Sequence, residues 1–220
     1  SLYGYYISDY GEKNLSLDIS NKGENICFIA PDQGILPHVK EVRKHSGLTN
    51  SVLASVIKSR AASGDIDNLS LGYVEGLNEE RGLQDMYLVW LDDAIRSGET
   101  AAVNFNAFSG IDEPRYRGKT LIIDQRLKGR PKRNAFIATR TNFAGESIRI
   151  LSTPGLDDLV ITNADPRGVA NLGILDEKTQ VLWINFVMAE AAKALETGAD
   201  PNEILTPSYI RNGRLLKIYI

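Results

Sequence analysis

The stretch Ile26-Cys27-Phe28-Ile29-Ala30, followed directly by Pro31-Asp32-Gln33-Gly34, combines an uninterrupted apolar run with a polar, turn-forming one. Five consecutive apolar residues are typical of a buried strand. Proline, aspartate and glycine favour a turn, so the strand is expected to end at Ala30. The alternation of apolar and polar residues over 15–20 predicts a second strand before it, and Asn21-Lys22-Gly23 is a plausible hairpin turn between the two.

Downstream of this turn the spacing of apolar residues becomes helical. Pro37 suits the first turn of a helix that contains Val42 and ends near Ser46-Gly47. A second helix is expected to start at Thr49 or Asn50. Its apolar positions are Val52, Leu53, Val56 and Ile57.

Two longer helices are also expected. The first begins after Asn78 and ends near Gly98. Its apolar stripe consists of Leu83, Met86, Tyr87, Trp90, Leu91, Ala94 and Ile95. The second spans about 177–197, is closed by Gly198, and has Ile184, Met188 and Leu195 among its inward positions.

Strands are expected before, between and after these helices. Further strand candidates are 101–108, Thr120–Asp124, Ala135–Thr139, Ile148–Leu151, Leu159–Thr162 and Arg214–Ile220. This order favours an α+β fold, with mixed or antiparallel sheets packed by about three to four helices. The chain is interpreted as one compact globular domain over residues 1–220, or as two closely packed subdomains with a boundary near 110–118.

Composition excludes several classes of protein. The 220 residues include one cysteine, Cys27, so an intramolecular disulfide and a cysteine-rich zinc site are both excluded. No cofactor and no metal site are expected. Apolar runs are broken well before 18 residues, and the first residues do not resemble a signal peptide. The sequence therefore predicts a cytoplasmic protein without a membrane partner.

The charges are strongly segregated along the chain. Residues 65–99 contain nine acidic residues and two arginines, a net charge of −7, whereas residues 115–140 contain nine basic residues and Asp124, a net charge of +8. We expect the basic segment to contact nucleic acid or another copy of the chain through Arg126, Lys128, Arg130, Lys132, Arg133 and Arg140. The complementary acidic patch is expected at Glu79, Glu80, Asp85, Asp92 and Asp93. Intramolecular pairing of the two segments, or simple solvation of both, is the alternative.

Two short motifs point weakly to nucleic acid. Lys128-Gly129-Arg130-Pro131-Lys132-Arg133 resembles the core of an AT-hook, which implies an arginine in an A·T-rich minor groove. A hairpin loop with a Gly-x-Pro turn explains the same six residues. Val42 to Ile57 partly resembles a helix-turn-helix unit with Gly47 in the turn, although Arg43 stands where a small buried residue is expected. An αα-hairpin without a DNA role shares that signature.

No catalytic residues are identified. Cys27 lies among apolar neighbours, as an inert buried thiol does. The carboxylates of Asp92-Asp93 and of Asp157-Asp158 are adjacent in sequence, so they are expected to point apart. The leading hypothesis is a non-enzymatic structural or assembly protein that self-associates, such as a virion component. The alternatives are a nucleic-acid-binding protein and a hydrolase whose site the sequence does not reveal, and whether the protein is an enzyme stays open.

Overall fold

The computed structural model describes residues 19–60, 62, 66–78, 80–95, 131–141, 155–162, 179–182, 196 and 198. These residues form seven strands, one α-helix and one 3₁₀ turn. Their bounds are η1 Ser20–Lys22, β1 Ile26–Ala30, α2 Leu36–Ser46, β2 Val52–Arg60, β3 Ile66–Glu75, β4 Tyr87–Ile95, β5 Arg133–Thr141, β6 Asp158–Thr162 and β7 Thr179–Leu182.

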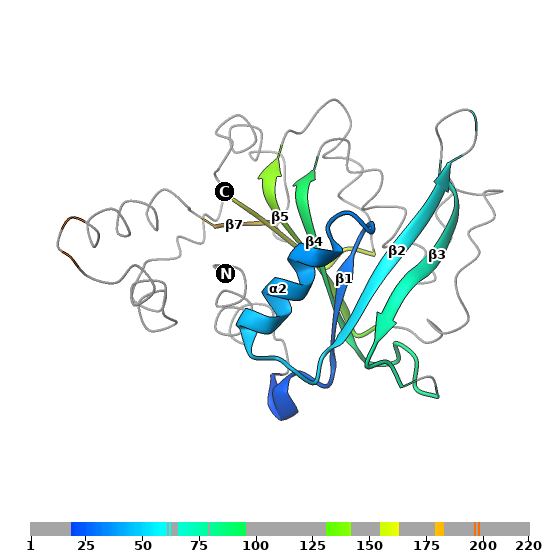
Figure 1. The fold of residues 1–220 in the computed structure, drawn as a ribbon, viewed down its shortest axis with the longest axis horizontal. Coiled ribbons are helices and arrows are strands. Elements are labelled where there is room, and N and C mark those ends of the chain that lie inside the picture. Colours follow the sequence, from blue (N-terminus) through cyan, green and yellow to red (C-terminus); the bar gives the residue numbers. More distant parts are fainter. Residues whose placement is uncertain are drawn as a thin grey trace.

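The seven strands form one sheet in the order β3-β2-β1-β4-β5-β6-β7 (Figure 1). Six of them run parallel, and only β3 is antiparallel, paired with β2 as a hairpin at one edge. Helix α2 connects β1 to β2 and lies across one face of the sheet. Parallel strands joined by a crossover helix define an α/β fold.

Both faces of the central strands are buried. Side chains of β1 alternate between two apolar clusters, with Phe28 under α2 and Ile29 on the opposite face. Val39 and Val42 of α2 pack into the first cluster, and Trp90 of β4 belongs to the second. Strands covered on both faces are near-continuous apolar runs, which explains the sequence of β1.

Several local predictions are confirmed. The strand predicted at Ile26–Ala30 is β1, and it ends at the predicted residue. Helix α2 has Pro37 in its first turn and ends at Gly47, whose φ of 73° lies in the left-handed region that favours glycine. The strands predicted at Ala135–Thr139 and Leu159–Thr162 lie within β5 and β6. The predictions for 101–108, Thr120–Asp124, Ile148–Leu151 and Arg214–Ile220 fall outside the described residues, as does the proposed boundary near 110–118.

The predicted fold class is wrong. The expected α+β arrangement of mixed or antiparallel sheets under three to four helices is replaced by one mostly parallel sheet, and in the described part of the chain α2 is the one complete helix. Residues 52–57 belong to strand β2, so the second helix of the helix-turn-helix resemblance does not exist. Residues 87–95 are strand β4 rather than a helix. Thr179–Leu182 is strand β7, within the range predicted as the last helix, although Glu196 near the end of that range is helical.

Burial on both faces explains these errors. In β4 every residue from Tyr87 to Leu91 is buried, so apolar residues occur at every spacing, including the i, i+3 and i+4 spacings of a helix. Residues Val52 to Val56 of β2 are likewise all buried. A helical pattern and a doubly covered strand cannot be told apart by periodicity when every position is apolar or small.

Cys27 is fully buried in the face opposite α2. Burial raises the pKa of its thiol far above the ordinary range, and the positive charge of Arg43 only partly opposes this. Among the described residues, no helix is both long enough and apolar enough to cross a membrane.

Replacement of Trp90 by alanine is expected to lower the free energy of unfolding by about 3–5 kcal/mol, the usual cost of removing a large aromatic side chain from a packed core. Trp90 is fully buried, and its indole Nε1 donates a hydrogen bond to Asn134 Oδ1 at 3.2 Å. Urea unfolding followed by circular dichroism measures the loss. A loss below about 1 kcal/mol would contradict the observed packing.

Candidate functional site

Successive strands of the chain are added on one side of β1 up to β3, and on the other side of β1 from β4 onward. From β1 the chain passes through α2 to β2 and β3 on one side, whereas β4, β5, β6 and β7 follow one another outward on the other side. In open α/β sheets, ligands bind outside the carboxyl ends of the strands at such a point. The register pairs Ile29 with Trp90, so the residues that follow β1 lie beside Asp92 and Asp93 at this edge.

The turn after β1 is shaped by Asp32. Its carboxylate oxygen Oδ1 accepts a hydrogen bond from the backbone N–H of Ile35 at 3.2 Å. The N–H of Leu36 donates to the carbonyl oxygen of Gln33 at 3.4 Å, which starts the helix. The turn therefore leaves β1 and enters α2 within a few residues, with the exposed side chains of Asp32 and Gln33 above the carboxyl end of β1.

Two neighbouring carboxylates act on Asp92 at this edge. Burial, a side-chain hydrogen bond with Asp93 and the charges of Asp93 and Asp32 together raise the pKa of Asp92 to about 6, against a backbone hydrogen bond from Asp93 that lowers it. The backbone N–H of Asp93 donates to Asp92 Oδ1 at 2.8 Å. Asp92 and Asp93 were expected to point apart, but their carboxyl groups interact directly at this point of β4.

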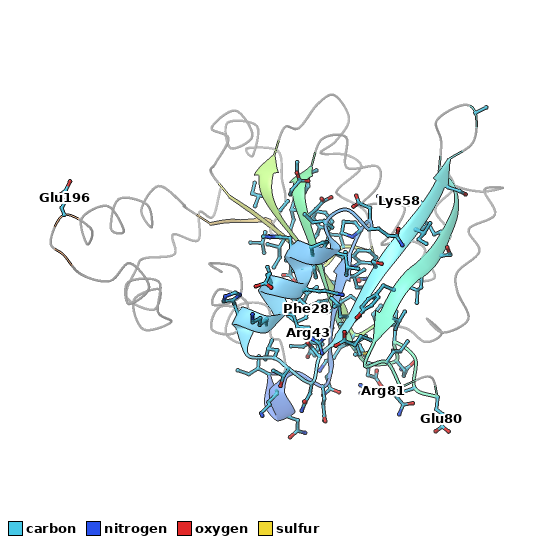
Figure 2. All side chains as sticks on the ribbon, viewed as in Figure 1. Phe28, Arg43, Lys58, Glu80, Arg81 and Glu196 are labelled. Atoms are coloured by element: carbon cyan, nitrogen blue, oxygen red, sulfur yellow. The ribbon has the colours of Figure 1, made fainter. Side chains whose placement is uncertain are left out.

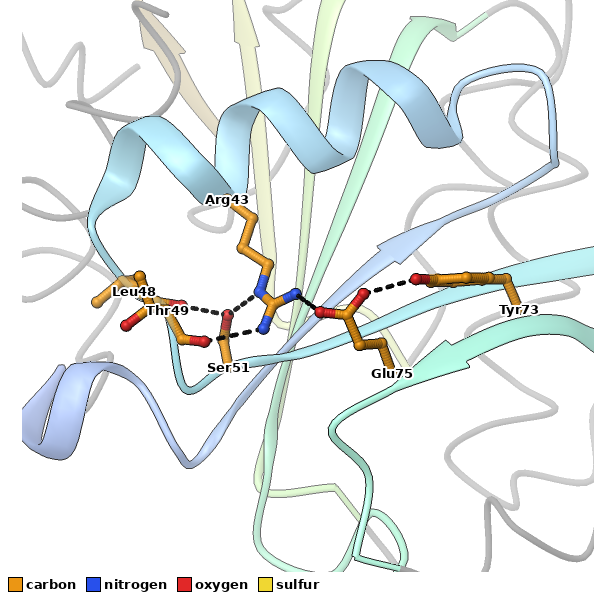
Figure 3. A network of polar contacts seen from close by, with 6 residues as sticks. All are labelled: Arg43, Leu48, Thr49, Ser51, Tyr73 and Glu75. Atoms are coloured by element: carbon orange, nitrogen blue, oxygen red, sulfur yellow. Dashed lines mark hydrogen bonds and ion pairs between the residues drawn. The ribbon is translucent and has the colours of Figure 1, made fainter.

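A polar network fixes α2 relative to the β2–β3 hairpin (Figure 3). The Arg43 guanidinium donates to Glu75 Oε1 at 2.6 Å, to Ser51 Oγ at 3.1 Å and to the carbonyl oxygen of Thr49 at 2.9 Å. The Tyr73 hydroxyl donates to the other oxygen of Glu75 at 2.5 Å. Hydrogen bonds from Tyr73 and Arg43 hold the pKa of Glu75 below its usual value. Arg43 does not fit the helix-turn-helix pattern, in which a small buried residue is expected at this position. In the structure it joins α2 to strand β3.

The hairpin extends beyond the edge at which the carboxylates lie. Strand β1 pairs with β2 only as far as Ala30 opposite Ser55, whereas β2 continues to Arg60. The upper part of the hairpin therefore stands beside the turn at residues 31–34, as Figure 1 shows. Ile57 lies in this part and is 42% exposed.

No metal site accompanies the carboxylates. Within the residues that the structure describes, no group of three or more histidine, cysteine, aspartate or glutamate side chains is arranged to hold a metal ion. The chemistry available at this edge is hydrogen-bond acceptance and negative charge from Asp92, Asp93 and Asp32.

The sequence-predicted acidic residues lie at two ends of the sheet. Glu80 and Asp85 precede β4 at its amino end, where Figure 2 shows Glu80 and Arg81 far from Lys58 of β2. Asp92 lies five residues along strand β4 from Tyr87, or about 17 Å, and Asp85 precedes that strand. The structure therefore brings Asp92 and Asp93 together with Asp32 rather than with Glu80 and Asp85. Glu79 is outside the described residues.

Two of the predicted basic residues lie at the amino end and have partners within the chain. Arg133 makes two hydrogen bonds to the buried carboxylate of Asp158, at 2.5 and 2.9 Å. Lys132 donates its backbone N–H to the carbonyl oxygen of Met86, and its ammonium lies 4.8 Å from the centre of the Tyr87 ring. Arg140 lies in β5. Arg126, Lys128 and Arg130 are outside the described residues, so contact with nucleic acid or another copy stays a prediction.

Sequence reasoning missed Asp32 and Gln33 as site residues. The turn signal was present, but turn chemistry alone gives no strand order, and the strand order is what places this turn beside Asp92. The pairing of β1 with β4 joins segments about sixty residues apart in the sequence, for which local periodicity carries no signal.

Comparison with solved structures shows a similar fold in the phosphoribosylpyrophosphate synthetase from Mycobacterium smegmatis. The TM-score is 0.58 at 17% sequence identity, and the match covers 89% of this chain and 51% of that one. The AQ2163 protein from Aquifex aeolicus matches with a TM-score of 0.39 and 12% identity, over 82% of this chain and 69% of that one. This chain spans about half the length of the synthetase. No protein-family model and no curated protein matches the sequence.

The Asp92→Asn variant is expected to be more stable than the wild type at pH 8, and to lose that advantage at pH 4. The folded protein raises the pKa of Asp92 above its unfolded value of 3.8 to about 6, so the folded state binds the proton more tightly and loses stability as the pH rises through this interval. Asparagine removes the charge that costs this stability. Urea unfolding at the two pH values measures the difference between the proteins.

The control is Asp85→Asn, the same chemical change at the amino end of β4. Asp85 is exposed and has a φ of 60°, a conformation that asparagine also tolerates. Its stability difference from the wild type gives the size of the effect of an Asp-to-Asn change at an exposed position. An Asp92→Asn advantage at pH 8 that is no larger than the effect of this control would contradict the assignment.

Proposed function

We propose that the protein binds a phosphorylated ribose at the carboxyl edge of the sheet, between the ends of β1 and β4. The observation that carries this proposal is the meeting of Asp92, Asp93 and Asp32 at the point where the strand order reverses. The similar fold of a synthetase whose name specifies a phosphoribosyl compound supports the choice of ligand. The proposed ligand class is ribose 5-phosphate and its derivatives.

The carboxylates suit the sugar. Vicinal hydroxyl groups of a ribose are hydrogen-bond donors, and ionised carboxylates are strong acceptors that can each accept more than one bond. Asp92 is partly buried, so a hydroxyl that donates to it also replaces water that burial has removed. Binding of a diol thereby offsets the desolvation of the charged carboxylate, which is the main cause of the raised pKa of Asp92.

A different stretch of sequence has residue types suited to binding the phosphate. Directly after β4 the chain reads Arg96-Ser97-Gly98-Glu99-Thr100, and these residues lie outside the described part of the structure. Arginine, two hydroxyl-bearing residues and a glycine are residue types that commonly hold phosphate oxygens. In the sequence this stretch begins three residues after Asp93, and its residue types favour a ligand that has both a diol and a phosphate.

Isothermal titration calorimetry with ribose 5-phosphate tests the proposal. The wild type is expected to bind, and Asp92→Asn to weaken binding about 10- to 100-fold, because a hydrogen bond to a charged acceptor contributes about 1.5–3 kcal/mol. The matched control, Asp85→Asn, should bind as the wild type does. Binding should also weaken below pH 6, where Asp92 becomes protonated.

Three results would contradict the proposal. They are no binding by the wild type at millimolar ligand, equal affinity in Asp92→Asn and the wild type, and binding of free ribose or inorganic phosphate as tight as that of ribose 5-phosphate. The last comparison tests whether one site takes both parts of the ligand.

Self-association, nucleic-acid binding, hydrolase activity and a cytoplasmic location remain predictions from the sequence. Arg133 pairs with Asp158 and Lys132 lies over the Tyr87 ring, so two of the basic residues have partners within the chain, and neither partner is an acidic residue of the 65–99 segment.

A further inference from the structure

A bulge at Gly72 of strand β3 leaves room for a side chain from the turn at residues 31–34, and this space over Gly72 is called the seat. Ser55 of β2 pairs with Tyr73, and Val56 pairs with Leu71, so Gly72 is the extra residue between them. A bulge next to a site commonly redirects the chain or allows a close approach. Here the residue that approaches Gly72 comes from another element, the turn between β1 and α2.

The side chain of Gln33 occupies this seat. A β-carbon at Gly72 would lie 2.6 Å from Gln33 Nε2 and 2.7 Å from Ile57 Cγ1, which is closer than non-bonded atoms approach. The backbone of Gly72 does not have a positive φ, so the lack of space, and not the backbone conformation, requires glycine here. Glycine within a strand often marks such a close approach.

The seat bears on the proposed ligand site because Gln33 and Asp32 are adjacent. Asp32 ends the turn by accepting the N–H of Ile35, and its charge acts on Asp92. The hairpin itself is fixed to α2 by Arg43, Glu75 and Tyr73. The amide nitrogen of Gln33 therefore lies close to Gly72, in a hairpin that is itself hydrogen-bonded to α2.

We infer that Gln33, whose amide lies close to Gly72, is a positioning residue that holds the turn at residues 31–34 in the geometry that binds the ligand. This inference rests on the proposed function for its ligand. It adds that affinity depends on a contact between the turn and the hairpin, made by residues that need not touch the sugar. Gly72 is part of the site through Gln33 alone.

A four-protein cycle tests the inference: wild type, Gly72→Ala, Gln33→Ala and the double variant. A methyl group at residue 72 displaces the flexible end of Gln33, so each single variant is expected to weaken ribose 5-phosphate binding about tenfold, as small displacements of positioning groups do. The double variant should bind no more weakly than either single variant, because both changes remove the same contact. Losses that add, or unchanged affinity in both single variants, overturn the inference.

Gly47→Ala is the matched control. It is also a glycine-to-alanine change, and with φ of 73° and no atom within 4 Å of the added carbon it strains the backbone without touching Gln33. We expect it to lower the unfolding midpoint and to leave affinity unchanged. A loss of affinity equal to that of Gly72→Ala would show that lowered stability alone weakens binding, and would overturn the inference.

Unfolding of the same four proteins in urea tests the seat without a ligand. Gln33→Ala should lower stability in the wild type and restore part of it in Gly72→Ala, where it removes the steric conflict with Gln33 and leaves the one with Ile57. If the wild type does not bind ribose 5-phosphate, the proposed function fails, and the unfolding cycle alone tests the contact between Gln33 and Gly72. Changes in the free energy of unfolding that add in the double variant would show that this contact does not exist. If the free energies of unfolding are coupled but the single variants bind ribose 5-phosphate as the wild type does, the positioning role is overturned and the proposed function is unaffected.

Discussion

The burial of β1 on both faces and its pairing along both edges is the constraint that the described structure depends on. All five of its residues have no exposed surface, and parallel ladders to β2 and β4 use both of its edges. A strand held in this way cannot shift its register without moving apolar side chains between the two clusters. The place where β1 ends is therefore fixed relative to β2 and β4, and so is the turn that carries Asp32 and Gln33.

The second fixed connection is polar. Arg43 is mostly buried, with 14% of its side chain exposed, and makes its contacts to Glu75, Ser51 and Thr49 from one guanidinium group. Three donors in a planar fork define an orientation more strictly than apolar packing does. The helix above β1 is thus attached to the hairpin beside it, and the Lys40 ammonium, 4.2 Å from the centre of the Tyr73 ring, adds a further contact between them.

Local signals in the sequence were sufficient for β1, its turn and α2, because each of them is determined within about ten residues. They failed for β2 and β4, where burial on both faces removes the alternation that distinguishes a strand from a helix. The site was harder still. Asp92 and Asp93 were selected for their charge and grouped with Glu80 and Asp85, whereas the neighbouring carboxylate of Asp92 is Asp32, from the turn after β1, which only the sheet order brings beside β4. Gly72 carried no signal, since a glycine in a strand shows its role only when the opposing side chain is known.

The site also illustrates a general tension between stability and binding. Partial burial and two neighbouring carboxylates raise the pKa of Asp92, which means that the folded chain holds this negative charge at a cost near neutral pH. A purely structural position would favour a neutral side chain. The cost arises near the carboxyl end of β4, where water still reaches Asp93, whereas at the amino ends of β5 and β6 the charges of Arg133 and Asp158 pair with each other.

The position of Cys27 has a practical consequence. The thiol has no exposed surface, and burial disfavours its reactive thiolate form, so alkylating reagents reach it only when β1 separates from its neighbours. Because β1 lies at the centre of the sheet, that separation requires opening of the core rather than fraying of an edge. The rate of thiol labelling therefore reports core opening directly, and the native chain offers no competing thiol to a cysteine introduced on its surface for spectroscopic probes.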